Sequence, residues 1–408
     1  MLNGEDGMAR ALIPIARARE LVLETLQVLP SEQVAIAAAL GRVLAADVRA
    51  TGNVPPFPCS AMDGYAVLAG DTGRVLEVVA ESRAGAPAAV EVRDGVAIRI
   101  STGATVPAGA TAVIPQEDVA SNGSSIETRA AVAVGDNVRG AGEDIHEGAT
   151  VLEAGTRLCG VELGAVTAAG AATVTVAARP RVSVLCTGDE LRAPGEPLGP
   201  GEIHNSNAPM LSGLATNAGA VTAEAQRVPD DHAATLAAIS GALRSSDVVI
   251  ISGGVSVGPH DHVKPVLAEL GVEEVFWSVS LQPGKPTWFG TGTGGQLVFG
   301  LPGNPVSAVV TFSLFVAPAL AAMQGARRDR TPESEAVLGV DIPRNPRREQ
   351  AVRVTLRRGE RLPVATPNGA QGSHILSSLI GADALAMIPA GEGSAPAGTV
   401  VALEALAR

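Results

Sequence analysis

Two glycine-rich turns, each at the end of an apolar run, carry the clearest chemical signal in the chain. Residues 247–251 form a β-branched run typical of a buried parallel strand, and the run stops at Ser252-Gly253-Gly254. Residues 297–300 form a second run that stops at Leu301-Pro302-Gly303-Asn304-Pro305. Glycines let backbone N–H groups approach a ligand, and Asn304 with Pro305 suits the first turn of a helix, whose N-terminus attracts anions. Both turns therefore predict an anion site.

Polar residues follow the strands predicted in the same half of the chain. From residue 181 onward, strand-like runs alternate with helical runs, which predicts a doubly wound α/β domain with mostly parallel strands. Ligands on such sheets bind beyond the carboxyl ends of the strands. Carboxylates gathered beside a phosphate site favour a hard cation such as Mg²⁺. The polar residues at these strand ends include Thr187, Gly188, Asp189, Glu190, Asn207, Asp230 and Asp261.

Other kinds of binding site find less support in the sequence. His260 and His262 flank Asp261, but two histidines without a third ligand nearby are more typical of a surface than of a zinc site. The glycine-rich turns fit neither a P-loop with its lysine nor a dinucleotide-binding fingerprint. The formal net charge of -12 disfavours a nucleic-acid-binding surface.

Length and composition predict a soluble protein of several domains. The chain of 408 residues is too long for one core, since domains hold roughly 100–200 residues. The N-terminus lacks a signal-peptide pattern, and we expect no apolar run long enough to span a membrane. The three cysteines, Cys59, Cys159 and Cys186, are widely spaced, which fits a reducing compartment. These features predict a cytoplasmic protein with no membrane segment and no nucleic-acid partner.

The N-terminal segment shows two helix signals. Residues 13–28 have apolar residues at helical spacing. Ser31 predicts the N-cap of a second helix that runs to Leu40 and stops at Gly41. Mixed strand and helix signals return at residues 146–179, which would close off an inserted unit.

The inserted unit is predicted to be rich in β-structure. Its first segment contains three prolines, which forbid a helix and predict a stiff loop that presents Asp63. Thr102 follows a predicted strand and is a possible oxyanion contact. For both residues, ordinary turn chemistry is the alternative interpretation. Arg139 is followed by Glu143 and Asp144, which in isolation predicts a surface ion pair.

The last part of the chain is predicted to be a small β-barrel or sandwich. After residue 327 a polar linker is followed by short strand-like segments at regular spacing. This part carries Arg353 and Ser373. The two side chains would either contact an anion or lie on the surface of the barrel.

Five motifs together make the chain resemble a known family. They are Pro55-Pro56-Phe57 with Ser60-Ala61-Met62-Asp63-Gly64-Tyr65-Ala66, Thr187-Gly188-Asp189-Glu190-Leu191, Ser252-Gly253-Gly254-Val255-Ser256-Val257-Gly258, Pro283-Gly284-Lys285-Pro286 and Leu301-Pro302-Gly303-Asn304-Pro305-Val306-Ser307. In this order, and over essentially the whole chain, they resemble the MoeA family of molybdopterin molybdenumtransferases, which is related to gephyrin. Each motif alone is modest, whereas five in order are specific.

The resemblance implies a multidomain α/β fold and an elongated homodimer with a cleft shared between subunits. Each subunit would have a mixed helical domain, an inserted β-rich domain, a doubly wound molybdopterin-binding α/β domain and a C-terminal β-barrel. The corresponding ranges are 1–50 with 146–179, then 51–145, 180–326 and 327–408.

The reaction implied by the resemblance inserts molybdate into adenylylated molybdopterin and releases AMP with the help of Mg²⁺. Asp63 and Thr102 would reach the cleft from the partner subunit. A transient contact with the molybdopterin adenylyltransferase is also implied. The implied catalytic residues are Asp63, Glu190, Asp230 and Asp261. The implied metal ligands are Asp189, Glu190, Asp230 and Asp261.

The resemblance also implies the residues that bind molybdopterin or molybdate. They are Thr102, Thr187, Gly188, Asn207, Ser252, Gly253, Gly254, Lys285, Pro302, Gly303, Asn304, Pro305, Arg353 and Ser373. Among them, an arginine fork with a hydroxyl suits a tetrahedral oxyanion. The chain departs from the family pattern at Ser278 and Gln282, where many relatives carry lysines, so the molybdate pocket is expected to hold less positive charge.

Two other functions are compatible with parts of the sequence. An adenylyltransferase or pyrophosphatase on the same α/β fold would need only residues 180–326, and the attached domains argue against it. A binding or scaffold protein without catalysis would not need the carboxylates Asp63, Glu190, Asp230 and Asp261. The transferase is therefore the preferred hypothesis.

Overall fold

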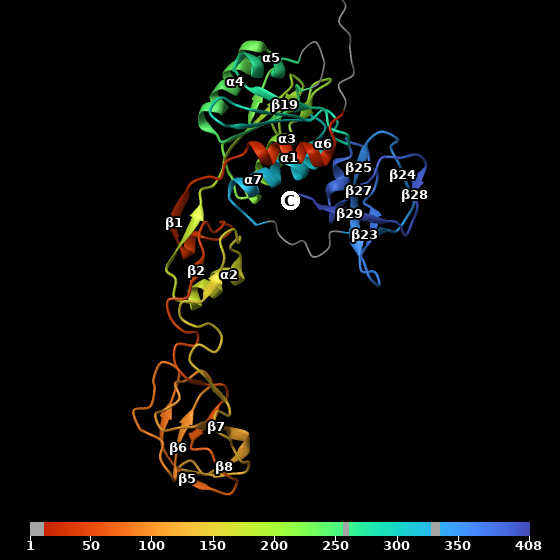
Figure 1. Ribbon diagram of the computed structural model, residues 1–408. Coiled ribbons are helices and arrows are strands. Elements are labelled where there is room, and N and C mark those ends of the chain that lie inside the picture. Colours follow the sequence, from red (N-terminus) through yellow and green to blue (C-terminus); the bar gives the residue numbers. More distant parts are fainter. Residues whose placement is uncertain (1–11, 256–260, 328–334) are drawn as a thin grey trace, which may run out of the picture. The chain divides into compact units, whose positions relative to one another are not determined.

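The computed structural model describes residues 12–255, 261–327 and 335–408 (Figure 1). Its contacts divide the chain into two compact units. Residues 33–176 form one, called here the inserted unit, and the segments up to residue 32 and from residue 177 form the other, called the main unit. The chain of the main unit is therefore interrupted once, by the whole of the inserted unit.

A seven-stranded sheet forms the centre of the main unit. Its strands follow the order β16-β13-β18-β22-β21-β19, and β17 also pairs with β13. β13, β18 and β22 are parallel, whereas β21 runs antiparallel to both its neighbours. The predicted doubly wound, mostly parallel sheet is confirmed, and the antiparallel edge is an addition. The strands are β13 Arg181–Thr187, β16 Val221–Thr222, β17 Gln226–Val228, β18 Val248–Ser252, β19 Glu273–Trp277, β21 Trp288–Thr291 and β22 Leu297–Leu301.

Helices cover both faces of this sheet because its strands are apolar on both sides. In β18, Val248 and Ile250 belong to one buried cluster and Val249 and Ile251 to another. The first cluster contains α1 (Ile15–Thr25), α3 (Asn207–Asn217), α6 (Pro305–Thr311) and α7 (Ala317–Met323), and the second contains α4 (His232–Ser245) and α5 (Val263–Glu269) (Figure 1). The helix predicted at residues 13–28 is confirmed as α1. A short parallel pair, β14 (Leu191–Arg192) and β15 (Ile203–His204), lies outside the sheet.

One long apolar helix runs along the first face. α6, the π-helical turn η3 (Phe312–Val316) and α7 form a single helix from Pro305 to Met323. By length and composition it could cross a membrane, so the expectation that the chain holds no such stretch was wrong. However, 78% of its apolar window is buried inside the protein. Contact with the sheet, rather than with lipid, explains its composition.

The C-terminal part of the main unit is a closed five-stranded barrel, as predicted. The strands follow the order β25-β26-β23-β29-β27, and β27 pairs again with β25. β20 (Leu281–Gln282), from the α/β part of the chain, adds to β25 in parallel. The barrel strands are β23 Glu335–Leu338, β25 Glu349–Arg357, β26 Val364–Pro367, β27 Ala384–Ile388 and β29 Val400–Ala405, and the pair β24 Ile342–Pro343 with β28 Ser394–Ala395 lies beside them.

The inserted unit contains a six-stranded sheet in the order β7-β4-β6-β5-β9-β8. This agrees with the predicted β-rich unit, except that the apolar run at residues 130–136, also expected to be a strand, forms only an isolated bridge at Val132. A separate pair, β3 (Cys59–Ser60) with β10 (Val138–Arg139), joins the segments that enter and leave this region. The sheet strands are β4 Gly64–Val67, β5 Val75–Ser82, β6 Val96–Ile100, β7 Ala112–Pro115, β8 Val119–Ser121 and β9 Ser125–Thr128.

The second predicted helix, residues 31–40, is wrong. The chain forms β1 (Ser31–Ala35), which pairs with β12 (Thr173–Ala177), and then only the 3₁₀ turn Ile36–Ala38. Pairing with a strand about 140 residues later overrides local helix propensity, which is a weak preference. Gly41, at φ 74°, ends the segment as expected. The same unit holds α2 (Gly160–Ala168) and the pair β2 (Val48–Arg49) with β11 (Thr150–Leu152).

Candidate functional site

Asp63 and Thr102 contact each other in the inserted unit. The backbone N–H and the hydroxyl of Thr102 both donate to Asp63 Oδ1, at 2.7 and 3.0 Å. These bonds, the backbone bond first, hold the pKa of the Asp63 carboxyl below its usual value. Both side chains are exposed. Asp63 is thus an ionised group held in one orientation rather than only a turn former.

The strand that follows Asp63 approaches its neighbour unusually closely. A Cβ atom on Gly64 would lie 2.0 Å from the carbonyl oxygen of Ile114 in β7. Before the strand, the Ser60 hydroxyl donates to Met62 O at 2.6 Å. The glycine and the serine together fix the backbone on both sides of Asp63.

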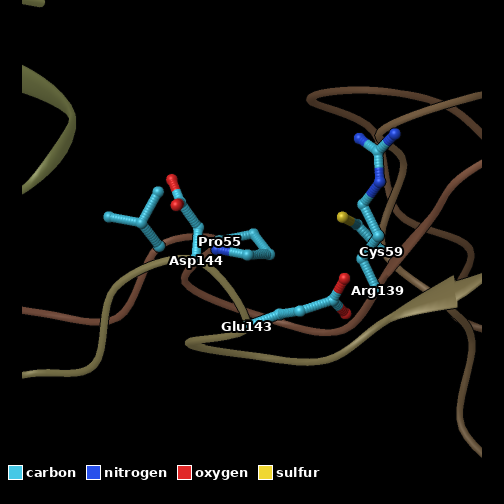
Figure 2. A pocket seen from close by; sticks show the side chains of 6 residues that line it. Pro55, Cys59, Arg139, Glu143 and Asp144 are labelled. Atoms are coloured by element: carbon cyan, nitrogen blue, oxygen red, sulfur yellow. The ribbon is translucent and has the colours of Figure 1, made fainter. Parts of the chain in front are cut away.

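A cavity of about 500 Å³ lies nearby in the same unit (Figure 2). Arg139 of β10 pairs with Cys59 of β3, and both residues line the cavity. Among the described residues no carboxylate forms an ion pair with Arg139, and Glu143 Oε2 instead accepts from Gly140 N at 2.8 Å. The expected surface ion pair is therefore not formed. The lining residues are Val54, Pro55, Cys59, Arg139, Glu143 and Asp144.

In the main unit, three carboxylates gather where β13 and β17 end. The backbone N–H of Asp189 donates to Asp230 Oδ2 at 3.4 Å, and that of Asp230 donates to Asp189 Oδ1 at 3.2 Å. Glu190 folds back over Gly188, where an added Cβ would lie 2.4 Å from Glu190 Oε2. Gly188 has a φ of 148°, which favours glycine, and the turn after β13 places acidic oxygens together at the carboxyl end of the sheet.

The glycine turn after β18 brings Thr187 and Asp261 to the same edge. A Cβ atom on Gly254 would lie 2.9 Å from Thr187 Oγ1 and 3.5 Å from Asp261 Oδ1. Gly253 and Gly254 have φ values of 91° and 63°, which side chains other than glycine rarely adopt. These glycines leave exposed backbone where a side chain would otherwise stand, as expected for close approach of a ligand.

Asn207, at the start of α3, connects the two glycine-rich turns. Its Nδ2 donates to Ser252 Oγ and to Gly303 O, both at 2.8 Å. Its Oδ1 is buried and has no hydrogen-bond partner among the residues that the structure describes. Ser252 Oγ also lies 3.4 Å from Pro302 O. The ends of β18 and β22 are thus joined through one amide.

The start of α6 meets a loop of the barrel. Asn304 stands at the N-cap, as predicted, but its side chain does not cap the helix. Its Nδ2 donates instead to Ser373 Oγ at 3.2 Å, and Val306 N donates to Ser373 O at 3.3 Å. The predicted turn residues Gly303 and Asn304 therefore adjoin both Asn207 and Ser373.

Arg353 is buried and donates hydrogen bonds to the barrel loop that contains Ser373. Its side chain is 1% exposed, and its Nε and Nη2 donate to Ser378 Oγ (3.1 Å) and Gly372 O (3.3 Å). Burial lowers the pKa of its guanidinium to about 10. No carboxylate of the described residues lies in ion-pair range of it. A buried cation without a counter-charge favours a bound anion.

Some predicted site residues are not brought into these clusters. Lys285 is exposed, and Asp63 and Thr102 belong to the other unit. Ser256, Val257, Gly258 and His260 lie outside the described residues. Within the described ranges there is no group of three His, Cys, Asp or Glu side chains arranged for a metal. Sequence reasoning missed Ser378, which accepts from Arg353 Nε, because it lies in no recognisable motif.

The fold and these turns define a multidomain α/β protein with glycine-rich turns at the carboxyl edge of its sheet and an attached barrel. Residues 13–170 match the MoeA N-terminal region (domain I and II), residues 183–322 a probable molybdopterin binding domain, and residues 335–406 the MoeA C-terminal region (domain IV). The chain belongs to the MoeA family.

Individual relatives agree with this assignment over nearly the whole chain. A molybdopterin molybdenumtransferase of Haemophilus influenzae is 35% identical, covering 96% of this chain and 98% of the relative. Molybdopterin molybdenumtransferase 2 of Mycobacterium tuberculosis is 36% identical, covering 93% and 96%. The crystal structure of a molybdopterin biosynthesis moeA protein from Pyrococcus horikoshii matches with a TM-score of 0.80 at 32% identity, covering 97% and 100%.

Proposed function

We propose that this chain inserts molybdate into adenylylated molybdopterin during molybdenum cofactor biosynthesis and releases AMP. The relatives named molybdopterin molybdenumtransferase support this function. The observation that carries it is Arg353, a buried guanidinium without a carboxylate partner among the described residues. It donates to the loop whose Ser373 contacts the turn that starts α6. Adenylylated molybdopterin would then bind at the strand-end turns, and molybdate would bind at an adjoining site near Arg353.

The strand-end turns are proposed to bind the phosphate groups of adenylylated molybdopterin. Their glycines expose backbone N–H groups, and Asn207 fixes the two turns relative to each other. Hydrogen-bond donors that are already oriented stabilise charge that develops as the phosphoanhydride bond breaks. The residues proposed for this binding are Thr187, Gly188, Asn207, Ser252, Gly253, Gly254, Pro302, Gly303, Asn304 and Pro305.

The carboxylates at the same edge suit Mg²⁺. Mg²⁺ needs only one or two carboxylates because substrate phosphates and water complete its coordination. Asp189 and Asp230, which contact each other's backbone, provide two such oxygens, with Glu190 and Asp261 close to the same turns. A bound Mg²⁺ would neutralise charge on the phosphate oxygens. The protein carboxylates would hold and orient it, and Glu190, Asp230 and Asp261 would also position the attacking water.

Molybdate is proposed to bind between α6 and the barrel, at Arg353 and Ser373, and Lys285, which lies outside this cluster, is proposed as a further, exposed contact. The guanidinium and the hydroxyl are donors that suit a tetrahedral dianion. Gln282 carries no charge, and its Oε1 accepts from Asn345 Nδ2. Ser278 is buried and short. The pocket would therefore hold molybdate with less positive charge than one with lysines at both positions.

The catalytic cleft is proposed to be completed by a second copy of the chain in the cytoplasm. Asp63 and Thr102 form an oriented pair in the inserted unit, and they would serve the strand-end site of the partner subunit. The substrate would come from an adenylyltransferase in a transient contact. The whole complex needs no nucleic acid and no membrane.

The test is AMP release from adenylylated molybdopterin with Mg²⁺, measured across a range of molybdate concentrations. Arg353→Gln should raise the KM for molybdate by about tenfold or more, since a charged donor contributes about 1.5–3 kcal/mol. Asp230→Asn should abolish AMP release at every molybdate concentration. Arg357→Gln, which changes an exposed residue on the same strand as Arg353, is the matched control. It should leave the KM for molybdate and the rate of AMP release unchanged.

Release of AMP without any effect of molybdate would refute the transferase and leave a pyrophosphatase. Absence of AMP release from the unchanged protein would favour a binding or scaffold protein.

A further inference from the structure

Arg19, a residue of α1 outside all five sequence motifs, joins three parts of the main unit. Its Nε donates to the carbonyl oxygen of Leu314 in the π-helical turn at 3.2 Å. Its Nη1 forms an ion pair with Glu404 Oε1 in barrel strand β29 at 2.9 Å. The side chains of Arg19 and Glu404 are 19% and 35% exposed, so this ion pair is partly shielded from solvent.

The Leu314 carbonyl lies four residues before a proline. In an α-helix it would accept from the N–H of residue 318, but residue 318 is a proline and has none. The helix forms a π turn at this point, from Phe312 to Val316. Arg19 thus donates to a carbonyl that cannot accept from residue 318, and its Nη1 pairs with Glu404 of the barrel.

The same turn holds the barrel through a second contact. The backbone N–H of Ala407, just after β29, donates to Ser313 Oγ at 3.0 Å. Ser313 Oγ in turn donates to Val309 O at 2.8 Å. Adjacent residues of the π turn, Ser313 and Leu314, are therefore both connected to the end of the barrel chain.

A second carboxylate depends on the charge of Arg19. Glu349 begins β25, four residues before Arg353. Burial and the charge of Glu404 raise the pKa of the Glu349 carboxyl, whereas Arg19 lowers it. Without Arg19, two half-buried acidic groups on β25 and β29 would repel each other with no cation between them.

The helix that carries the π turn also carries the proposed molybdate site. Its first turn begins after Asn304, which contacts Ser373 of the barrel loop, and its middle contacts Arg19 and Ala407. The barrel is thus attached to one rigid helix at two points. The contact at Arg19 restricts how the loop with Ser373 and the strand with Arg353 can sit against the start of α6.

We infer that Arg19 is a positioning residue for oxyanion binding, which sets the barrel residues Arg353 and Ser373 against the first turn of α6. This inference rests on the proposed function, because it takes molybdate as the anion. Arg19 itself touches no substrate. Its removal should weaken capture of molybdate while leaving the binding of adenylylated molybdopterin at the strand ends intact.

The test compares the kinetics of Arg19→Met with those of the unchanged chain. Methionine retains the apolar stem and removes both polar contacts. The KM for molybdate should rise about tenfold, and the KM for adenylylated molybdopterin should not change, since coupling between contacting groups reaches about 1.4 kcal/mol, a factor of ten. A general loss of folded protein would lower kcat for both substrates together and leave both KM values unchanged.

Three further variants make the result specific. Arg17→Met is the matched control, because Arg17 lies on the same helix and, within the described part of the chain, pairs only with Glu20 and Glu24. Arg19→Lys keeps one charged contact and should raise the KM for molybdate only a few-fold. Adding Glu349→Gln to Arg19→Met removes the carboxylate repulsion and should recover part of the loss.

Hydrogen exchange gives a readout that does not depend on activity. Amides of residues 400–408 should exchange faster in Arg19→Met than in Arg17→Met. An unchanged KM for molybdate in Arg19→Met would overturn the inference if Arg353→Gln still raises that KM. If Arg353→Gln has no effect either, the proposed molybdate site fails instead, so the two failures can be told apart.

Discussion

At the scale of single residues, the contact between Asp63 and Thr102 makes a carboxyl group unusually acidic. Two hydrogen bonds from Thr102 to one oxygen stabilise the ionised form, and the nearby charge of Arg99 acts in the same direction. A carboxyl whose pKa is lower in the folded state contributes stability above its unfolded pKa. That contribution is lost as the pH falls through the folded pKa.

We predict that Thr102→Val raises the pKa of Asp63, because the hydroxyl bond disappears while the backbone bond remains. The measurement is a carboxyl ¹³C NMR titration of Asp63 in both proteins. Thr102→Ser retains the hydroxyl and should titrate like the unchanged protein. Equal pKa values in Thr102→Val and the unchanged protein would show that the hydroxyl does not act on Asp63.

Several site residues could be recognised from their types and spacing alone. Glycines after apolar runs predict close backbone approach, and Gly253 and Gly254 have the positive φ values that this requires. The burial of the Arg353 side chain could not be predicted from residue types and spacing. Its burial depends on Gly372 and Ser378, which reach it through a loop without a motif.

At the scale of elements, Gly64 decides whether β4 can pair with β7. We predict that Gly64→Ala destabilises the inserted unit by about 3 kcal/mol, because the new methyl group would overlap the Ile114 carbonyl, which is held in the sheet. The melting temperature should fall by about 10 °C, measured by calorimetry.

Gly70→Ala is the control for this prediction. A Cβ there would meet only the guanidinium end of Arg74, at 2.7 Å, and that flexible side chain can move aside. Its melting temperature should stay within about 2 °C of that of the unchanged protein. Similar losses in both variants would mean that the close approach of β4 to β7 is not the cause.

Elements with a strong periodic pattern could be predicted, and elements set by distant partners could not. The helix α1 and the barrel strands follow their own apolar spacing. β1 instead depends on pairing with β12, which lies far away in the sequence. The only signal for the π turn in the sequence is Pro318, which lacks an N–H. The donation from Arg19 to the Leu314 carbonyl depends on tertiary packing and could not be predicted.

At the scale of the whole molecule, the proposed cleft takes residues from two copies of the chain. Asp63→Asn and Asp261→Asn, each expected to be inactive alone, should therefore restore activity when co-expressed. About a quarter of the normal activity is expected if subunits pair at random, because half of the dimers then have one intact cleft of two. The measurement is AMP release from the purified mixture.

Co-expression of Asp230→Asn with Asp261→Asn is the matched control. Both changes affect the main unit, so no dimer would contain an intact cleft and no activity should return. If the first pair also stays inactive while dimers form, each chain must use its own Asp63.

The interrupted chain of the main unit also has a consequence for biosynthesis. Arg19 and Leu314, which are in contact, are 295 residues apart, so at about 5–20 residues per second their meeting is delayed by roughly 15–60 s after Arg19 is made. Throughout that time the apolar side chains of α1, Ile15, Ala18 and Val22, lack the π-helical turn and α7, the elements that α1 contacts. All of residues 33–176 emerge from the ribosome during this delay. The nascent chain therefore exposes the apolar face of its first helix at a stage when the inserted unit already has every residue it needs to fold.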